Sequence, residues 1–137
     1  MMAQNPKYAE IKPEDAAALV KSNAALLVDV RTPEEFEKGH FEGAVNIPVK
    51  IVSGDGMVDN PDFDEQVKEK LGDKKEARII CTCFGGGRGG VASGKLVDWG
   101  YNSISNMVGG MGAWAKAGEP VVGEIAPRNT KALTFKN

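Results

Sequence analysis

Short apolar runs alternate along the chain with segments that carry helix signals. Apolar residues without polar alternation occupy 24–30, 44–49 and 77–83, a pattern typical of strands that are covered on both faces. Weaker strand candidates lie at 8–11 and 103–108. Because predicted strands and helices alternate, the sequence predicts an α/β fold with an open, doubly wound, mainly parallel five-stranded sheet flanked by helices.

The predicted helices carry recognisable boundary residues. Four segments are predicted to be helical: 12–23, 32–39, 60–72 and 88–100. In the second, Thr32 is a suitable cap, Glu35 three residues later completes a capping box, and Gly39 ends the helix. The third is expected to start from Asn60 and Pro61.

The remaining segments and the composition indicate a single domain. Residues 52–62 are predicted to form an exposed loop, and no clear period follows Pro120. The chain has 137 residues, of which 42% are hydrophobic and 26% charged, as in ordinary globular domains. We therefore expect one domain over 1–121 and a C-terminal tail of uncertain order over 122–137.

Charge and cysteine content narrow the expected partners and compartment. Lys and Arg number 17 against 19 Asp and Glu, a formal net charge of −2, and no basic block is present, so we expect no nucleic acid or membrane partner. No apolar run approaches the ~18 residues of a membrane span, and residues 1–15 lack the apolar core of a secretory signal. Two cysteines separated by one residue form no disulfide framework, which predicts a cytoplasmic location. The sequence predicts no particular oligomeric state.

The stretch IICTCFGGGRGG (79–90) has the composition of a reactive loop. Cys83 ends a predicted strand just before a predicted helix, where the helix dipole and free N–H groups stabilise a thiolate. Glycines at 85, 86 and 87 allow successive N–H groups to turn inward and bind an anion. Arg88 adds a permanent positive charge. The loop is therefore suited to holding negative charge on or beside the Cys83 sulfur.

The two cysteines also have less specific interpretations. On local chemistry alone, a buried and inert Cys83 in a glycine-rich turn is as good an interpretation as a reactive one. Cys81 lies inside the apolar run, which favours core packing over a role as a resolving thiol. A zinc site has little support, because His40 is the single histidine and no second cysteine pair exists. We expect no metal and no cofactor.

Three separate motifs resemble those of one family. The motifs are LLVDVRTPEEFEKGHFEGAVNIP (26–48), CFGGGR (83–88) with the helix end LVDWGY (96–101), and NMVGGMGAWAKAGEPV (106–121). They resemble, in order, the first signature, the active-site loop and the closing signature of the rhodanese family, which comprises persulfide-forming sulfurtransferases. The similarity spans residues 7–121.

The resemblance implies specific roles for the loop residues. Counting back from the helix end identifies Cys83 as the catalytic cysteine, with Arg88 at the family's usual arginine position. Four residues separate the two, one fewer than in related cell-cycle phosphatases and arsenate reductases, as in the sulfur-transferring branch. The substrate- and anion-binding loop is then expected to comprise Phe84, Gly85, Gly86, Gly87, Arg88 and Gly89.

The resemblance also implies a mechanism. The Cys83 thiolate attacks the outer sulfur of a donor such as thiosulfate or a persulfide, and the resulting persulfide passes its sulfur to cyanide or a thiol. The expected partners are therefore small-molecule or protein sulfur donors and acceptors. The amides of residues 84–88 are expected to stabilise the persulfide, and Arg88 to hold the anionic donor. Where the family often has Ser or Thr after the arginine, this chain has Gly89.

Other residues in the motifs are expected to be structural, and two other functions stay open. The structural group comprises Asp29, Arg31, His40, Trp99, Gly109, Gly110 and Trp114. One alternative function is a non-catalytic rhodanese-like module for partner binding or redox sensing. The other is oxyanion chemistry, as in a phosphatase or an arsenate reductase, against which the short loop argues.

Overall fold

A parallel sheet forms the centre of the protein in the computed structural model, which describes residues 8–126. Its strands, in spatial order, are β1 (Ala9–Ile11), β8 (Ser103–Met107), β7 (Arg78–Thr82), β2 (Leu26–Asp29) and β4 (Val45–Asn46). All four pairings are parallel. Each strand falls within a predicted apolar run, the two weaker candidates included. The predicted open α/β sheet is thus confirmed.

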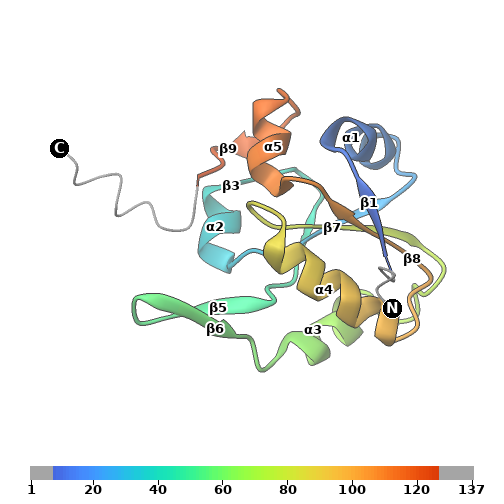
Figure 1. Ribbon diagram of the computed structural model, residues 1–137, viewed down its shortest axis with the longest axis vertical. Coiled ribbons are helices and arrows are strands. Elements are labelled where there is room, and N and C mark those ends of the chain that lie inside the picture. The colour runs from blue at the N-terminus through green and yellow to red at the C-terminus, as the bar shows by residue number, and fades with distance from the viewer. Residues whose placement is uncertain (1–7, 127–137) are drawn as a thin grey trace, which may run out of the picture.

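Helices cover both faces of this sheet (Figure 1). They are α1 (Pro13–Lys21), α2 (Pro33–Lys38), α3 (Phe63–Lys70), α4 (Gly87–Asp98) and α5 (Gly110–Lys116). One core cluster joins α1 and α5 to the sheet, and a second joins α3 and α4 to it. Apolar residues on both faces explain why the strands show no polar alternation.

Strand β7 shows how the sequence divides its side chains between the two cores. Ile80 packs with α1 and α5, whereas Ile79 and Cys81 pack with α3 and α4. Successive side chains of a strand point to opposite faces. Cys83 follows in the same cluster as Cys81, so both thiols lie on the α4 side of the sheet.

Local sequence signals predicted the start of α2 correctly and the start of α3 wrongly. The predicted capping box is confirmed, because the Glu35 N–H donates to Thr32 Oγ1 at 3.2 Å and the Thr32 N–H donates to Glu35 Oε1 at 3.0 Å. The predicted start of the third helix at Asn60 is wrong, since α3 begins at Phe63. Asn60 instead forms a turn in which its Oδ1 accepts the Asp62 N–H at 2.9 Å.

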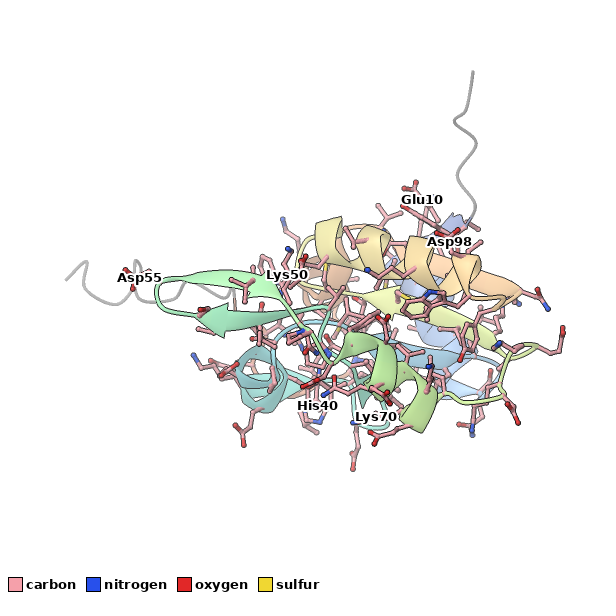
Figure 2. All side chains as sticks on the ribbon, turned by 90° about the horizontal axis from the view of Figure 1, so that it is seen from below. Glu10, His40, Lys50, Asp55, Lys70 and Asp98 are labelled. Atoms are coloured by element: carbon pink, nitrogen blue, oxygen red, sulfur yellow. The ribbon has the colours of Figure 1, made fainter. Side chains whose placement is uncertain are left out.

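Residues 52–62 are largely exposed, as predicted, but the prediction of a loop is wrong for most of their length. Strands β5 (Lys50–Ser53) and β6 (Gly56–Asp59) form an antiparallel hairpin there. Gly54 has φ +61° at the first position of its two-residue turn, the arrangement expected of a tight hairpin turn. Figure 2 shows the hairpin projecting from the body, with Asp55 at its tip and Lys50 at its base. Glycine and aspartate in the turn masked the strand pattern.

Two short strands tie the C-terminal segment to the end of α2. Strands β3 (Gly39–His40) and β9 (Val122–Gly123) pair antiparallel, and the Glu124 N–H donates to the Lys38 carbonyl at 2.9 Å. The first residues of the predicted tail are therefore part of the fold, whereas its last residues, 127–137, lie outside the described range. In residues 8–126 every helix is too short or too polar to cross a membrane.

Candidate active site

Cys83 lies at the carboxyl edge of the sheet, between the end of β7 and the start of α4. The residue is 1% exposed, and its Sγ accepts a hydrogen bond from the Gly86 N–H at 2.9 Å. The first turn of α4 adds unpaired N–H groups and the positive end of the helix dipole. The structure therefore places the thiol at the predicted junction of strand and helix, with a backbone donor on its sulfur.

Gly86 has the backbone conformation that directs this N–H toward the sulfur. Its φ is +119°, in the left-handed region that favours glycine, whereas Gly85 and Gly87 have no positive φ. In the described structure Gly86 supplies the loop amide that bonds to Sγ. Stabilisation of a persulfide by the remaining amides of 84–88 stays a prediction.

The first turn of α5 holds the opposite side of the loop. The Met111 N–H donates to the Cys83 carbonyl at 2.6 Å, and the Gly112 N–H donates to the Phe84 carbonyl at 2.9 Å. Gly110 has φ +59°, and a Cβ there would collide with the carbonyl oxygens of Cys83 and Phe84. Helix α5 thus fixes the backbone of the loop at Cys83 and Phe84, while the Gly86 N–H bonds to the sulfur.

Arg88 forms a two-pronged ion pair with Glu35 of α2. Its Nη1 donates to Glu35 Oε1 at 2.6 Å and its Nη2 to Oε2 at 3.0 Å. Burial alone would lower the pKa of Arg88, but the hydrogen bond and charge of Glu35, together with the nearby Cys83, raise it above its ordinary value. The guanidinium is thus charged beside the Cys83 loop and is held from the side by a carboxylate.

Glu35 is a site residue that the sequence identified only as part of a helix cap. Its side chain is 4% exposed, and its Oε1 accepts from Thr32 as well as from Arg88. Burial would raise the pKa of Glu35, but hydrogen bonds from Arg88 and Thr32 lower it below the ordinary carboxyl value. The capping box therefore also fixes the carboxylate that orients Arg88.

A second buried ion pair fixes the end of the neighbouring strand. Arg31 donates from Nε to Asp29 Oδ1 at 2.9 Å and from Nη2 to Oδ2 at 2.7 Å. The same Nη2 donates to the Gly39 carbonyl at 2.7 Å. Both side chains are fully buried. This arrangement confirms the predicted structural role of the pair, which joins the end of β2 to the end of α2.

Cys81 lies in a different environment from Cys83. It is fully buried among apolar residues of the α3 and α4 core. Burial raises the pKa of its thiol to about 12, an effect only partly offset by a hydrogen bond with Ser93. Reactivity depends on the thiolate. The packing interpretation of Cys81 is thus the one that the structure supports.

Phe84 borders a shallow cleft beside the loop. A cleft of about 620 Å³ is lined by Phe84, Gly85, Gly109, Gly112, Ala113, Ala115 and Lys116. The Phe84 ring packs on Gly112, where a Cβ would lie 3.3 Å from the ring. Apart from Phe84 and Lys116, the residues that line this cleft are glycine or alanine, so little side-chain bulk fills it.

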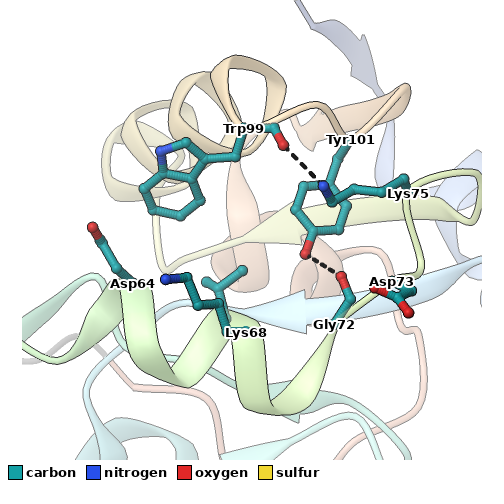
Figure 3. A pocket seen from close by; sticks show the side chains of 8 residues that line it. Asp64, Lys68, Gly72, Asp73, Lys75, Trp99 and Tyr101 are labelled. Atoms are coloured by element: carbon teal, nitrogen blue, oxygen red, sulfur yellow. Dashed lines mark hydrogen bonds between the residues drawn. The ribbon is translucent and has the colours of Figure 1, made fainter.

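A second pocket lies at the C-terminal end of α4, where Trp99 caps the helix (Figure 3). Its volume is about 540 Å³, and the Trp99 and Tyr101 rings form one wall of it. The Tyr101 hydroxyl donates to the Gly72 carbonyl at 2.8 Å, and Lys75 Nζ donates to the Trp99 carbonyl at 3.2 Å. These polar groups serve to join the walls of the pocket to one another. Trp99, which the sequence predicts to be structural, follows α4 as its C-terminal cap and lines this pocket.

The other predicted structural residues occupy scaffold positions. His40 Nδ1 lies 2.7 Å from the Phe36 carbonyl oxygen, and the two rings stack with centroids 3.9 Å apart. Trp114 is fully buried, and its indole N–H donates to the Pro120 carbonyl at 3.0 Å. These contacts confirm the structural interpretation. Gly109 and Gly110, also expected to be structural, both have positive φ and form the turn that leads into α5.

Fold and site together define a class of α/β proteins that present a cysteine on a glycine-rich loop between a strand and a helix N-terminus. The model of the rhodanese-like domain matches residues 12–117. This protein belongs to the rhodanese-like family. The predicted family membership is thereby confirmed.

Named relatives agree with this assignment. The chain is 45% identical over 93 residues to thiosulfate sulfurtransferase 16, chloroplastic, of Arabidopsis thaliana, covering 68% of this chain and 76% of that protein. It is 43% identical over 104 residues to the mitochondrial protein HIGH ARSENIC CONTENT 1 of the same plant. That match covers 76% of this chain but 59% of the relative, so the chain spans little more than half of that protein.

Solved structures show the same fold. A rhodanese-related protein from Thermoplasma volcanium is 27% identical, with a TM-score of 0.65 over 85% of this chain and 100% of that one. Thiosulfate sulfurtransferase from Pseudomonas aeruginosa is 23% identical, with a TM-score of 0.68 over 85% of this chain and 20% of that one. The second likeness shows the fold alone.

Proposed function

We propose that the protein is a sulfurtransferase that carries sulfane sulfur as a persulfide on Cys83. The observation that carries the proposal is the Gly86 N–H bonded to the Cys83 sulfur at 2.9 Å, at the N-terminus of α4. A backbone donor on the sulfur favours the thiolate over the thiol. Relatives named thiosulfate sulfurtransferase support the same reaction class.

The reaction proceeds in two displacement steps. The Cys83 thiolate attacks the outer sulfur of thiosulfate or of a persulfide; a new S–S bond forms, the S–S bond of the donor breaks, and sulfite or a thiolate leaves with the electron pair. In the second step cyanide or a thiolate attacks the outer sulfur of the Cys83 persulfide. A bond forms between the acceptor and that sulfur, the S–S bond of the persulfide breaks, and its electron pair restores the Cys83 thiolate, so ping-pong kinetics are expected.

The surroundings of Cys83 support both steps. The Gly86 N–H faces the inner sulfur, and the charged Arg88 lies beside the loop, held by Glu35. Arg88 would attract an anionic donor, while Glu35 fixes the direction of the guanidinium. The small residues of the cleft beside Phe84 leave room for a donor or acceptor that carries more than the sulfur itself.

The test is thiocyanate formation from thiosulfate and cyanide, with mass spectrometry of the donor-treated protein. The wild type should turn over and gain the mass of one sulfur atom on the peptide that contains Cys83. The Cys83→Ser variant should do neither. A wild type with no turnover and no adduct from thiosulfate or from glutathione persulfide would contradict the proposal and favour a non-catalytic binding or sensing module.

A second candidate, chemistry on an oxyanion such as arsenate, is favoured by one observation. A relative at 43% identity is named HIGH ARSENIC CONTENT 1. Reduction of arsenate to arsenite would require a thiol reductant, which is oxidised to the disulfide as arsenic gains the electron pair. Arsenite release from arsenate with glutathione, lost in Cys83→Ser, would support this candidate; no release with an active sulfur transfer would reject it.

A further inference from the structure

Asn106 of β8 contacts the same glycine that binds the Cys83 sulfur. Its side-chain Nδ2 donates to the Gly86 carbonyl at 3.3 Å, while the Gly86 N–H donates to Cys83 Sγ at 2.9 Å. The Gly90 N–H of α4 donates to the same carbonyl at 3.0 Å. Gly86 is therefore held at its carbonyl by a side chain from β8 and by the first turn of α4.

The other polar atom of the same side chain has no partner. Asn106 is 7% exposed. Among the described residues 8–126, its Oδ1 is the one buried polar side-chain atom that has no hydrogen-bond partner. Leaving a buried carbonyl unpaired destabilises a fold, so such a group calls for an explanation. The Nδ2 atom of the same amide is directed at Gly86, and Oδ1 faces the position that a Cβ on Gly89 would occupy.

The Asn106 side chain occupies the space that a side chain at position 89 would need. A Cβ on Gly89 would overlap Asn106 Oδ1 and would lie 3.4 Å from its Cγ. The next neighbour, the Cys83 nitrogen, would be 3.7 Å away, which is an ordinary contact. Gly89 has no positive φ, so its backbone accepts other residues. Asn106 is thus the neighbour outside α4 that a side chain at position 89 would meet first.

We propose that Asn106 is a positioning residue for the Cys83 loop, and that Gly89 is required because any side chain there displaces Asn106. By holding the Gly86 carbonyl, Asn106 keeps the residue in its left-handed conformation and keeps its N–H on the sulfur. For the rate of sulfur transfer this inference rests on the proposed function. The expected effect of Asn106 on the reactivity of the Cys83 thiol does not depend on that function.

The experiment compares Asn106→Ala, Gly89→Ala and the double variant with the wild type. Iodoacetamide alkylation of Cys83 is followed as a function of pH by mass spectrometry of the peptide. The readout is the midpoint pH of the rate rather than the plateau, because a looser loop also exposes the sulfur. Asn102→Ala is the matched control, since Asn102 bonds to the exposed Glu76 at 2.8 Å and does not contact the loop.

The expected result is a higher midpoint pH in Asn106→Ala, because the thiolate loses a fixed N–H donor for part of the time. Sulfur transfer should fall about tenfold, less than the 10²–10³-fold loss that follows removal of a whole oxyanion donor. Asn102→Ala should match the wild type in both measurements. An unchanged midpoint in folded Asn106→Ala would overturn the proposal.

The double variant tests whether the two residues act through one contact. If Gly89→Ala works by displacing Asn106, then Gly89→Ala, Asn106→Ala and the double variant should share one midpoint and one rate. Losses that multiply, or a Gly89→Ala variant that behaves as the wild type, would overturn the proposal. Should Asn106→Ala fail to fold, Asn106→Leu keeps the approximate size, removes the N–H donor and gives the same readout.

The two possible failures are distinguishable. A wild type without turnover from any donor would contradict the proposed function, while the alkylation midpoints would still report on Asn106. A shared shift of these midpoints together with absent turnover would leave Asn106 as a positioning residue of a non-catalytic thiol site.

Discussion

The two cysteines lie two residues apart on the same side of β7 and belong to one core cluster, yet their environments differ sharply. Both are almost completely buried, at 0% for Cys81 and 1% for Cys83. Cys81 is within the strand, and burial raises its thiol pKa to about 12. Cys83 is just beyond the strand, where the Gly86 N–H reaches its sulfur. Exposure does not distinguish the two thiols. Their positions do, because beyond the end of the strand a backbone N–H is available to bond to a buried sulfur.

The largest expected effect is a difference in thiol reactivity. With a pKa of about 12, Cys81 has on the order of 10³-fold less thiolate near neutral pH than an ordinary cysteine with pKa ~8.5. Iodoacetamide at neutral pH should therefore label Cys83 and leave Cys81 unmodified. Peptide mass mapping of the native protein measures this, and the urea-unfolded protein, in which both should react, is the control. Equal labelling of the two cysteines in the native protein would contradict the expected difference in their reactivity.

The next effect concerns the ion pair that distinguishes the surroundings of Cys83. Glu35→Gln keeps the shape of the side chain but leaves Arg88 without its charged partner, so unfolding should become easier by about 3 kcal/mol. Sulfur transfer should fall about tenfold or more as the guanidinium loses its orientation. Glu34→Gln, in the same turn and exposed, is the matched control. Full activity in Glu35→Gln would show that Arg88 needs no partner.

The same pair gives a pH dependence of stability. The pKa of Glu35 is lowered in the folded state, so its stabilisation is complete above the ordinary carboxyl pKa of ~4.3 and is lost as the pH falls through the lowered value. The difference in unfolding free energy between wild type and Glu35→Gln should thus be largest near neutral pH and shrink in acid. Urea unfolding between about pH 7 and about pH 3 measures this. A constant difference would argue against an ionised, paired Glu35.

The smallest effect is expected at Cys81. Cys81→Ser should retain sulfur transfer within about twofold, because the thiol has no part in the two displacement steps. It should lower the free energy of unfolding by about 1–2 kcal/mol, since a hydroxyl is buried in an apolar core. Thiocyanate formation and urea unfolding give the two values. Loss of turnover in a folded Cys81→Ser protein would revive the role of Cys81 as a resolving thiol.

The sequence predicted those parts of the protein that depend on local pattern. Apolar runs identified all five strands of the central sheet, and the capping box at Thr32 identified the start of α2. The position of Cys83 followed from these, because a strand end and a helix start were both visible around it. The hairpin over 50–59 was missed, since its glycines and aspartates are also typical of loops.

Contacts between distant segments were not predictable in the same way. Glu35 showed a cap signal, but nothing local indicated that its carboxylate also meets Arg88. Asn106 lies in an apolar strand segment and contacts Gly86 only once β8 and β7 are paired. Helix α5 was missed because its first turn is rich in glycine, which disfavours helices in isolation.

Because α5 is hydrogen-bonded to the Cys83 loop, the accessibility of the thiol depends on whether the C-terminal part of the domain is docked. The Met111 and Gly112 amides bind the carbonyls of Cys83 and Phe84, so the loop geometry is complete only when segments far apart in the chain have met. Partial opening of the protein at α5 would then release the loop before the sheet separates. The rate at which Cys83 becomes modified would therefore report how often this helix leaves its place, in a protein that is otherwise folded.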